Sequence, residues 1–199
     1  MSEQVFHIPY TLGDKARLFD LGQGIHSNVS LVLKKGGGKV TTMTQTLKKM
    51  RVQAVMFGLL AVAQTGLMAA SDGLSFGKIV LAALCALLGG LLWASQSGNK
   101  KAFARAQELY LQNNGKAGTL TVDEDGICEC NEAGRETRFG WEDYRCCIMS
   151  EEAIVVVFYK PVMLIVSRTK ETEDGLVEAL LAFDKERTIY EVEIKEKKK

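Results

Sequence analysis

Four cysteines in the second half of the chain are the residues with the clearest chemical potential. Cys128 and Cys130 are two residues apart, and Cys146 and Cys147 are adjacent. Four thiolates can bind zinc in a tetrahedron at about 2.3 Å. However, zinc sites favour cysteines with about two to four residues between them, and adjacent strand residues point to opposite faces. We therefore predict no metal and no cofactor, and interpret these residues as reduced thiols that serve as small hydrophobic side chains.

The remaining polar residues form no catalytic motif. The two histidines, His7 and His26, lie near the N-terminus, where Asp14 or Asp20 could pair with one of them. No motif supplies a nucleophile, and no carboxylates have metal-ligand spacing. The acidic run 123–125 is followed by glycine, which is typical of a turn. We expect a protein without enzymatic activity.

The glycine run Gly36–Lys39 resembles a phosphate-binding loop only superficially. A P-loop needs a glycine five positions before the glycine that precedes its lysine, and a serine or threonine after the lysine. Here no glycine lies five positions before Gly38, and Val40 follows Lys39. We interpret the run as a flexible basic turn. The region after residue 99 has an excess of acidic residues, which argues against nucleic acid as a partner.

Two apolar segments separated by a short turn-rich stretch dominate the middle of the chain. Residues 52–70 contain no charged side chain, and residues 79–94 follow after about eight residues. At about 1.5 Å per residue, nineteen helical residues approach the ~30 Å hydrocarbon core of a bilayer. The alternative, two buried helices of a soluble protein, is disfavoured because neither segment has a polar stripe. We predict a transmembrane hairpin over residues 51–96, in contact with the lipid bilayer.

The charged residues beside the hairpin predict its orientation. Lysine and arginine precede the first segment, and Lys100, Lys101 and Arg105 follow the second. Because positive residues near span ends remain in the cytoplasm, both termini are expected there. The expected location is the inner membrane, as a multi-pass protein. Small residues at Gly58, Ala61, Gly66, Gly89 and Gly90 would allow the two helices to approach closely or to pair with another membrane protein.

The regions outside the hairpin have the pattern of an α+β protein. Residues 1–50 are expected to form a strand and a short helix, since Phe6, Ile8, Tyr10 and Leu12 alternate. A connecting helix over 99–117 precedes a series of short strands and an amphipathic helix capped by Thr172. This small antiparallel β domain with its C-terminal helix is expected to span residues 118–187, followed by a charged tail over 188–199, in which the apolar residues of 189–194 add a last strand or a helix extension.

The hairpin and the strand series together resemble one family. Phe139, Trp141 and Asp143 form an F-x-W-x-D motif, followed by an acidic turn and two apolar strands. With the preceding hairpin, this is similar to the bacterial YcxB-like membrane proteins over roughly residues 45–183. The resemblance implies a pleckstrin-homology-like C-terminal domain, in which the three motif residues are structural. It implies no activity.

These observations lead to one main functional hypothesis and two alternatives. The main hypothesis is a non-enzymatic integral membrane protein that presents a binding or regulatory domain to the cytoplasm, where another membrane protein or a cytoplasmic protein is its partner. The first alternative is a membrane-embedded immunity factor that blocks a toxin. The second is a metal or redox sensor that uses Cys128, Cys130, Cys146 and Cys147.

Overall fold

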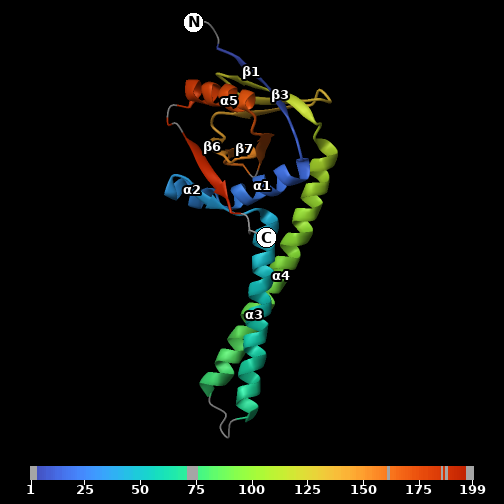
Figure 1. The fold of residues 1–199 in the computed structure, drawn as a ribbon, viewed down its shortest axis with the longest axis vertical. Helices are drawn as coiled ribbons and strands as arrows, with labels where there is room; N and C mark the ends of the chain where they lie inside the picture. Colours follow the sequence, from blue (N-terminus) through green and yellow to red (C-terminus); the bar gives the residue numbers. More distant parts are fainter. Residues whose placement is uncertain (1–3, 71–75, 161, 185, 187, 196–199) are drawn as a thin grey trace. The chain divides into compact units, whose positions relative to one another are not determined.

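The computed structural model describes residues 4–70, 76–160, 162–184, 186 and 188–195. The chain is a mixed α+β protein with two compact units (Figure 1). One unit is Thr44–Ala106, and the other combines Met1–Met43 with Gln107–Lys199. We refer to them as the helical unit and the α+β unit.

The helical unit consists of most of two long helices, α3 (Met43–Ala70) and α4 (Phe76–Asn113), and the end of α4 after Ala106 belongs to the α+β unit. The expected connecting helix is the C-terminal part of α4 rather than a separate element. Both helices are long and apolar enough to cross a membrane. Most of their large apolar side chains are exposed, whereas Ala54, Cys85 and Gly89 are among the few buried residues.

The two helices approach closely at glycine. A Cβ atom on Gly89 would lie 3.3 Å from the Ala54 carbonyl oxygen and 3.3 Å from the Gly58 nitrogen. At Gly66 and Gly90 a Cβ atom would meet nothing within 4 Å. The prediction of close approach is therefore confirmed at Gly89, which lies against the backbone of Gly58, whereas a Cβ atom on Gly58 itself would also meet nothing within 4 Å.

The first sheet of the α+β unit combines residues from both sides of the hairpin. Its order is β1-β3-β4-β5, and every pair is antiparallel. The strands are β1 (Phe6–Thr11), β3 (Ala117–Asp123), β4 (Gly126–Asn131) and β5 (Glu136–Gly140). Strand β1, predicted from its alternation, pairs with β3 from Phe6↔Val122 to Thr11↔Ala117. Its inner face includes Ile8, which is buried.

The second sheet has the order β2-β9-β6-β7-β8. The strands are β2 (Gly38–Val40), β6 (Tyr144–Met149), β7 (Ala153–Phe158), β8 (Met163–Ser167) and β9 (Ile189–Ile194). Strands β6, β7 and β8 are antiparallel neighbours, whereas β9 lies parallel to both β2 and β6. Every residue of β7 is buried, which explains its continuous apolar sequence.

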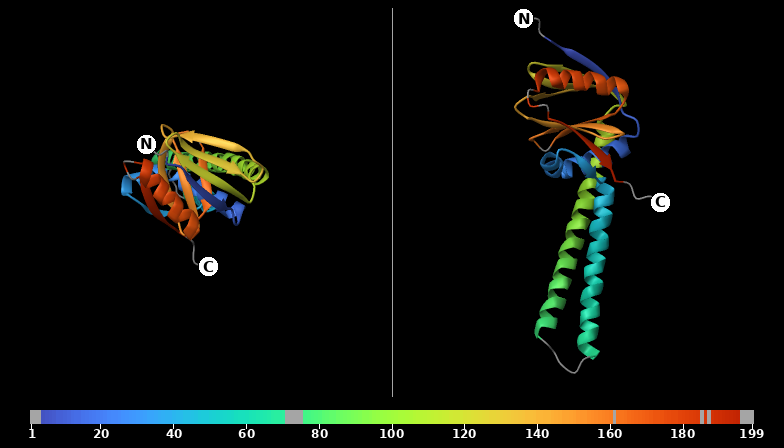
Figure 2. Two further views of the ribbon diagram at one scale, coloured as in Figure 1. Left: turned by 90° about the horizontal axis from the view of Figure 1, so that it is seen from above. Right: turned by 60° about the vertical axis from the view of Figure 1, so that its left-hand side comes forward.

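Three helices cover the sheets: α1 (Lys15–Ser27), α2 (Val29–Lys35) and α5 (Lys170–Phe183). Figure 2 shows, in its right-hand view, α5 above the strands and the blue helices α1 and α2 below them. Helix α1 packs on the second sheet so closely that a Cβ atom at Gly22 would lie 2.4 Å from Ile165. Helix α5 packs against β1, where Gly175 faces Ile8. The Phe139 ring of β5 stacks on Phe158 of β7 at 4.2 Å, which joins the two sheets.

The start of α5 and the glycine run differ from the structure predicted from the sequence. Thr172 does not cap α5, because the cap is Thr169, whose side-chain oxygen accepts a hydrogen bond from the Thr172 nitrogen. The glycine run does end α2, through Gly36 in the left-handed conformation, but Gly38–Val40 is a strand. It is paired in parallel with the last strand, β9, over Val192–Ile194. The local sequence contains no signal for this distant partner.

Arg168 connects three elements at the end of β8. Its guanidinium donates hydrogen bonds to Glu173 of α5 at 2.6 and 2.8 Å. It also donates to Glu191 of β9 and to the carbonyl oxygen of Ser150, each at 3.1 Å. The hydrogen bonds from Arg168 hold the pKa of Glu173 below its usual value.

We expect Arg168→Gln to lower the free energy of unfolding at pH 7, because it removes these charge-assisted hydrogen bonds. The loss should be only about 1–2 kcal/mol, because solvent screens the partly exposed charges. A carboxyl group with a depressed folded pKa stabilises the protein above its unfolded pKa, near 4.5, and this contribution disappears as the pH falls through the folded value. The stability gap between wild type and variant should therefore narrow below about pH 4.5 in denaturant titrations. Glu173→Gln is the matched control. In a protein that carries Glu173→Gln, the effect of Arg168→Gln on the free energy of unfolding should depend much less on pH. A gap of the same size at about pH 7 and pH 3 would contradict the assignment.

Candidate functional site

The α+β unit contains a pocket of about 260 Å³ between the end of α4, the β4–β5 hairpin and β8. Apolar side chains form part of its wall, among them Phe139, Met163 and Leu164. Polar side chains line the remainder: Tyr110, Asn113, Asn114, Glu129, Asn131, Arg135 and Thr137. The combination of an apolar wall and a few convergent polar groups is typical of small-molecule sites.

Glu129 is an acidic residue on the inner face of the first sheet. Residues of β4 alternate between its two faces, so Glu129 lies on the same face as the buried Ile127. The hydroxyl of Tyr10, on β1, donates a hydrogen bond of 2.6 Å to the Glu129 carboxylate. Burial and the bond to Glu129 raise the pKa of Tyr10, so Tyr10 retains its proton and remains a donor. No described residue forms an ion pair with Glu129.

Tyr110 extends the polar part of the pocket from the last turns of α4. Its ring packs on Phe19 of α1 with the ring centroids 5.0 Å apart. Burial and the nearby Glu129 charge raise the pKa of Tyr110, so it too keeps its phenolic proton. Within the described part of the chain, its hydroxyl has no hydrogen-bond partner and is available to a ligand.

Arg135 lies in the turn between β4 and β5, at the rim of the pocket. The Asn131 side chain orders this turn by accepting hydrogen bonds from the backbone nitrogens of Ala133 and Arg135, each at 3.0 Å. Gly134 has a positive φ of 73°, which completes the reversal. The guanidinium of Arg135 is exposed and forms no ion pair with a described residue.

The four cysteines lie on two different sheets. Cys128 and Cys130 are partly exposed on β4, whereas Cys146 and Cys147 are buried on β6. Burial raises the pKa of Cys146 to about 11 and that of Cys147 still further, so both are poor nucleophiles. In the described ranges, no three or more His, Cys, Asp or Glu side chains are placed to bind a metal ion.

The three residues of the F-x-W-x-D motif make specific contacts within the α+β unit. The Phe139 ring stacks on Phe158, as described above. Trp141 donates a hydrogen bond from Nε1 to the Asp123 carbonyl oxygen at 2.9 Å and stacks on Phe183. Asp143 forms an ion pair with Lys160 across the hairpin of β6 and β7.

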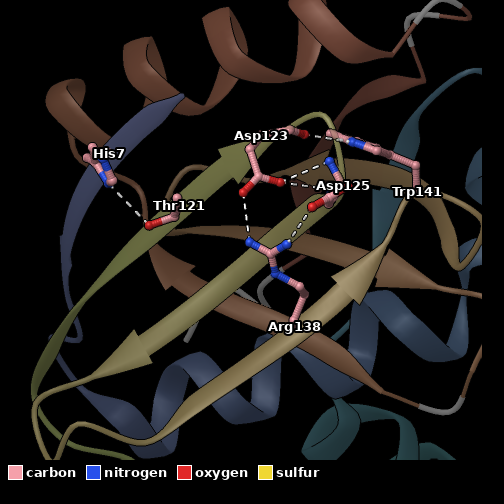
Figure 3. Close-up of polar contacts among 7 residues, drawn as sticks. His7, Thr121, Asp123, Asp125, Arg138 and Trp141 are labelled. Atoms are coloured by element: carbon pink, nitrogen blue, oxygen red, sulfur yellow. Dashed lines mark hydrogen bonds and ion pairs between the residues drawn. The ribbon is translucent and has the colours of Figure 1, made fainter. Parts of the chain in front are cut away.

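The outer face of the first sheet carries polar side chains that interact with one another (Figure 3). His7 is 3.2 Å from the Thr121 hydroxyl, and Arg138 binds Asp123 at 2.7 Å and Asp125 at 3.1 Å. Asp123 also accepts the backbone N–H groups of Asp125 and Gly126. The acidic run is thus a turn that Arg138 neutralises.

The other residues considered for acid–base chemistry have separate positions. His26 lies in the last turn of α1, and Asp14 caps the start of that helix through a hydrogen bond from the Arg17 nitrogen. Asp20 lies within α1.

Glu129 was not identified from the sequence, although a signal was present. In the alternating segment Ile127–Cys130, an acidic side chain occupies the position that continues the apolar face. An acid at such a position predicts a buried partner or a ligand.

Comparison of the chain with family models, curated proteins and solved structures gives no match.

Proposed function

We propose that this chain is a non-enzymatic integral membrane protein in which α3 and α4 form a hairpin anchor and the α+β unit is a binding or regulatory domain. The observation that carries the proposal is the exposure of large apolar side chains along both helices. Leu59 is 64% exposed and Leu87 is 59% exposed near the centres of the two apolar segments. In water such a surface would be costly, whereas lipid chains would cover it.

The pairing of β1 with β3 supports the hairpin topology. The two strands lie on opposite sides of the apolar helices in the sequence, yet they form six residue pairs in one sheet. Segments that share a sheet must lie on the same side of a membrane, so the chain between them crosses it an even number of times. The basic residues beside the helices favour the cytoplasmic side.

The proposal includes a relationship to the YcxB-like proteins and a pleckstrin-homology-like domain. It is supported by two successive antiparallel groups, β3-β4-β5 and β6-β7-β8, followed by α5.

Arg51 lies 5.9 Å from the Trp93 ring, and both residue types favour the headgroup region at the ends of membrane spans.

Protease accessibility tests the anchor and its topology. Epitope tags are placed at both ends of the full chain, and sealed membrane vesicles of known orientation are treated with protease. Both tags should be cleaved when the cytoplasmic face is outside, and both should be protected when it is inside. Detergent permeabilisation, as the control, should expose both. Release of the protein by an alkaline carbonate wash, or cleavage of the two tags from opposite faces, would overturn the proposal.

A further inference from the structure

We propose that the pocket beside Glu129 binds a small organic cation, a protonated amine with an apolar body, whose ammonium group pairs with the Glu129 carboxylate. This inference rests on the proposed role of the α+β unit as a binding domain, and it defines the chemistry of the ligand.

Glu129 has unused hydrogen-bonding capacity. A carboxylate has about four acceptor positions, and Tyr10 occupies one of them at 2.6 Å. No described cation neutralises the remaining charge, although Glu129 lies on the inner face of the sheet. A charged group in such a position is stabilised by a cation that also donates hydrogen bonds. An ammonium group meets both requirements.

The size and the lining of the pocket suit a small ligand with an apolar body. Phe139, Met163 and Leu164 supply apolar surface to contact the body of a ligand. Phe139 also offers an aromatic ring, and aromatic rings attract cations. The volume of about 260 Å³ is slightly below the ~300–1,000 Å³ typical of drug-sized ligands, so the ligand is small.

The charged side chains that line the pocket favour a cationic ligand over an anionic one. An anionic ligand in the pocket would be repelled by the Glu129 carboxylate, since like charges at short range disfavour one another. Among the described residues that line the pocket, the only basic side chain is Arg135, which is exposed in the turn at the rim. Arg135 can pair with an anion outside the pocket, whereas Glu129 and the Tyr110 hydroxyl remain for a ligand inside.

The test is titration calorimetry of the purified full chain in detergent with phenethylamine as the probe. Its neutral N-acetyl derivative and the anion 3-phenylpropionate have the same ring without the positive charge. Phenethylamine should bind, and both analogues should bind at least tenfold more weakly. Equal binding of the three probes, preferential binding of the anion, or no binding of the amine would overturn the proposal.

Three variants locate the binding. Glu129→Gln should weaken amine binding at least tenfold, and so should Thr137→Phe, which fills the pocket beside Glu129 and leaves its bond to Tyr10 in place. Glu136→Gln is the matched control, because Glu136 is exposed on the other face of the same sheet, and its affinity should equal that of wild type. If Thr137→Phe binds as tightly as wild type, the pocket is not the site. The protease and carbonate results above do not depend on a ligand, so failure of this proposal is distinguishable from failure of the anchor.

Discussion

Gly126→Ala is expected to prevent folding of the α+β unit, whereas Gly134→Ala in the next turn leaves it folded. Gly126 begins β4 with a φ of 140°, and a Cβ atom there would lie 2.0 Å from the Phe139 carbonyl oxygen. That oxygen belongs to the backbone of the neighbouring strand β5, so it cannot rotate away. The β4–β5 pairing, which includes Gly126↔Gly140, would have to separate.

Gly134 provides a matched control in the same sheet. It also has a positive φ, but a Cβ atom there would meet nothing within 4 Å. Gly134→Ala should therefore cost only about 1–2 kcal/mol for the left-handed conformation. The loss in Gly126→Ala should approach the whole stability of an ordinary domain, roughly 5–15 kcal/mol. Circular dichroism melting of the purified full-length variants measures both; a Gly126→Ala melting temperature close to that of Gly134→Ala contradicts the close approach of Gly126 to β5.

Replacement of Leu59 and Leu87 together by arginine should abolish stable membrane insertion. Each arginine at the centre of a span costs about 2.5–3.5 kcal/mol, and each lost leucine removes a favourable contribution, so the total approaches ~6–7 kcal/mol. Both side chains are exposed, so the substitution breaks no packing inside the helical unit. The same change on exposed helices of a soluble protein would leave folding intact and raise solubility.

The measurement is the fraction of full-length protein that remains in the membrane after an alkaline carbonate wash. The double variant Leu59→Ala and Leu87→Ala is the control, because it removes the same leucines and adds no charge. Retention of the alanine variant and release of the arginine variant is the expected result. If the arginine variant stays in the membrane fraction as fully as wild type, α3 and α4 do not contact lipid at these positions.

Local features of the fold were predictable from the sequence. The apolar helices, the strands from β3 to β8 and helix α5 each follow from patterns within a few residues, such as alternation, an Asp-Gly turn or helical spacing. The Asp123–Gly126 turn has the predicted form because the Asp123 side chain bonds the backbone that follows it. These interactions depend on neighbours in the chain.

The partners of the outer strands were not predictable. Strand β1 alternates clearly, but its pairing with β3 joins residues more than a hundred positions apart, and β2 and β9 are still farther apart. The candidate site was not predictable for the same reason, because Tyr10 lies beside Glu129 only when β1 pairs with β3 and β3 pairs with β4. The four cysteines show the opposite case. Their spacing in the sequence raised the question of a shared metal site, but the fold places the two pairs on different sheets.

The pairing of β1 with β3 and of β2 with β9 also determines the order of events during biosynthesis. Strands β1 and β2 are made before both apolar helices, whereas their partners β3 and β9 are made only after these helices. Contacts of such long sequence separation form slowly. In the proposed membrane topology, β1 and β2 therefore remain unpaired while the hairpin inserts into the membrane. For a nascent chain of this kind, insertion comes before folding, and a delay in translation after α4 extends the time in which β1 can aggregate.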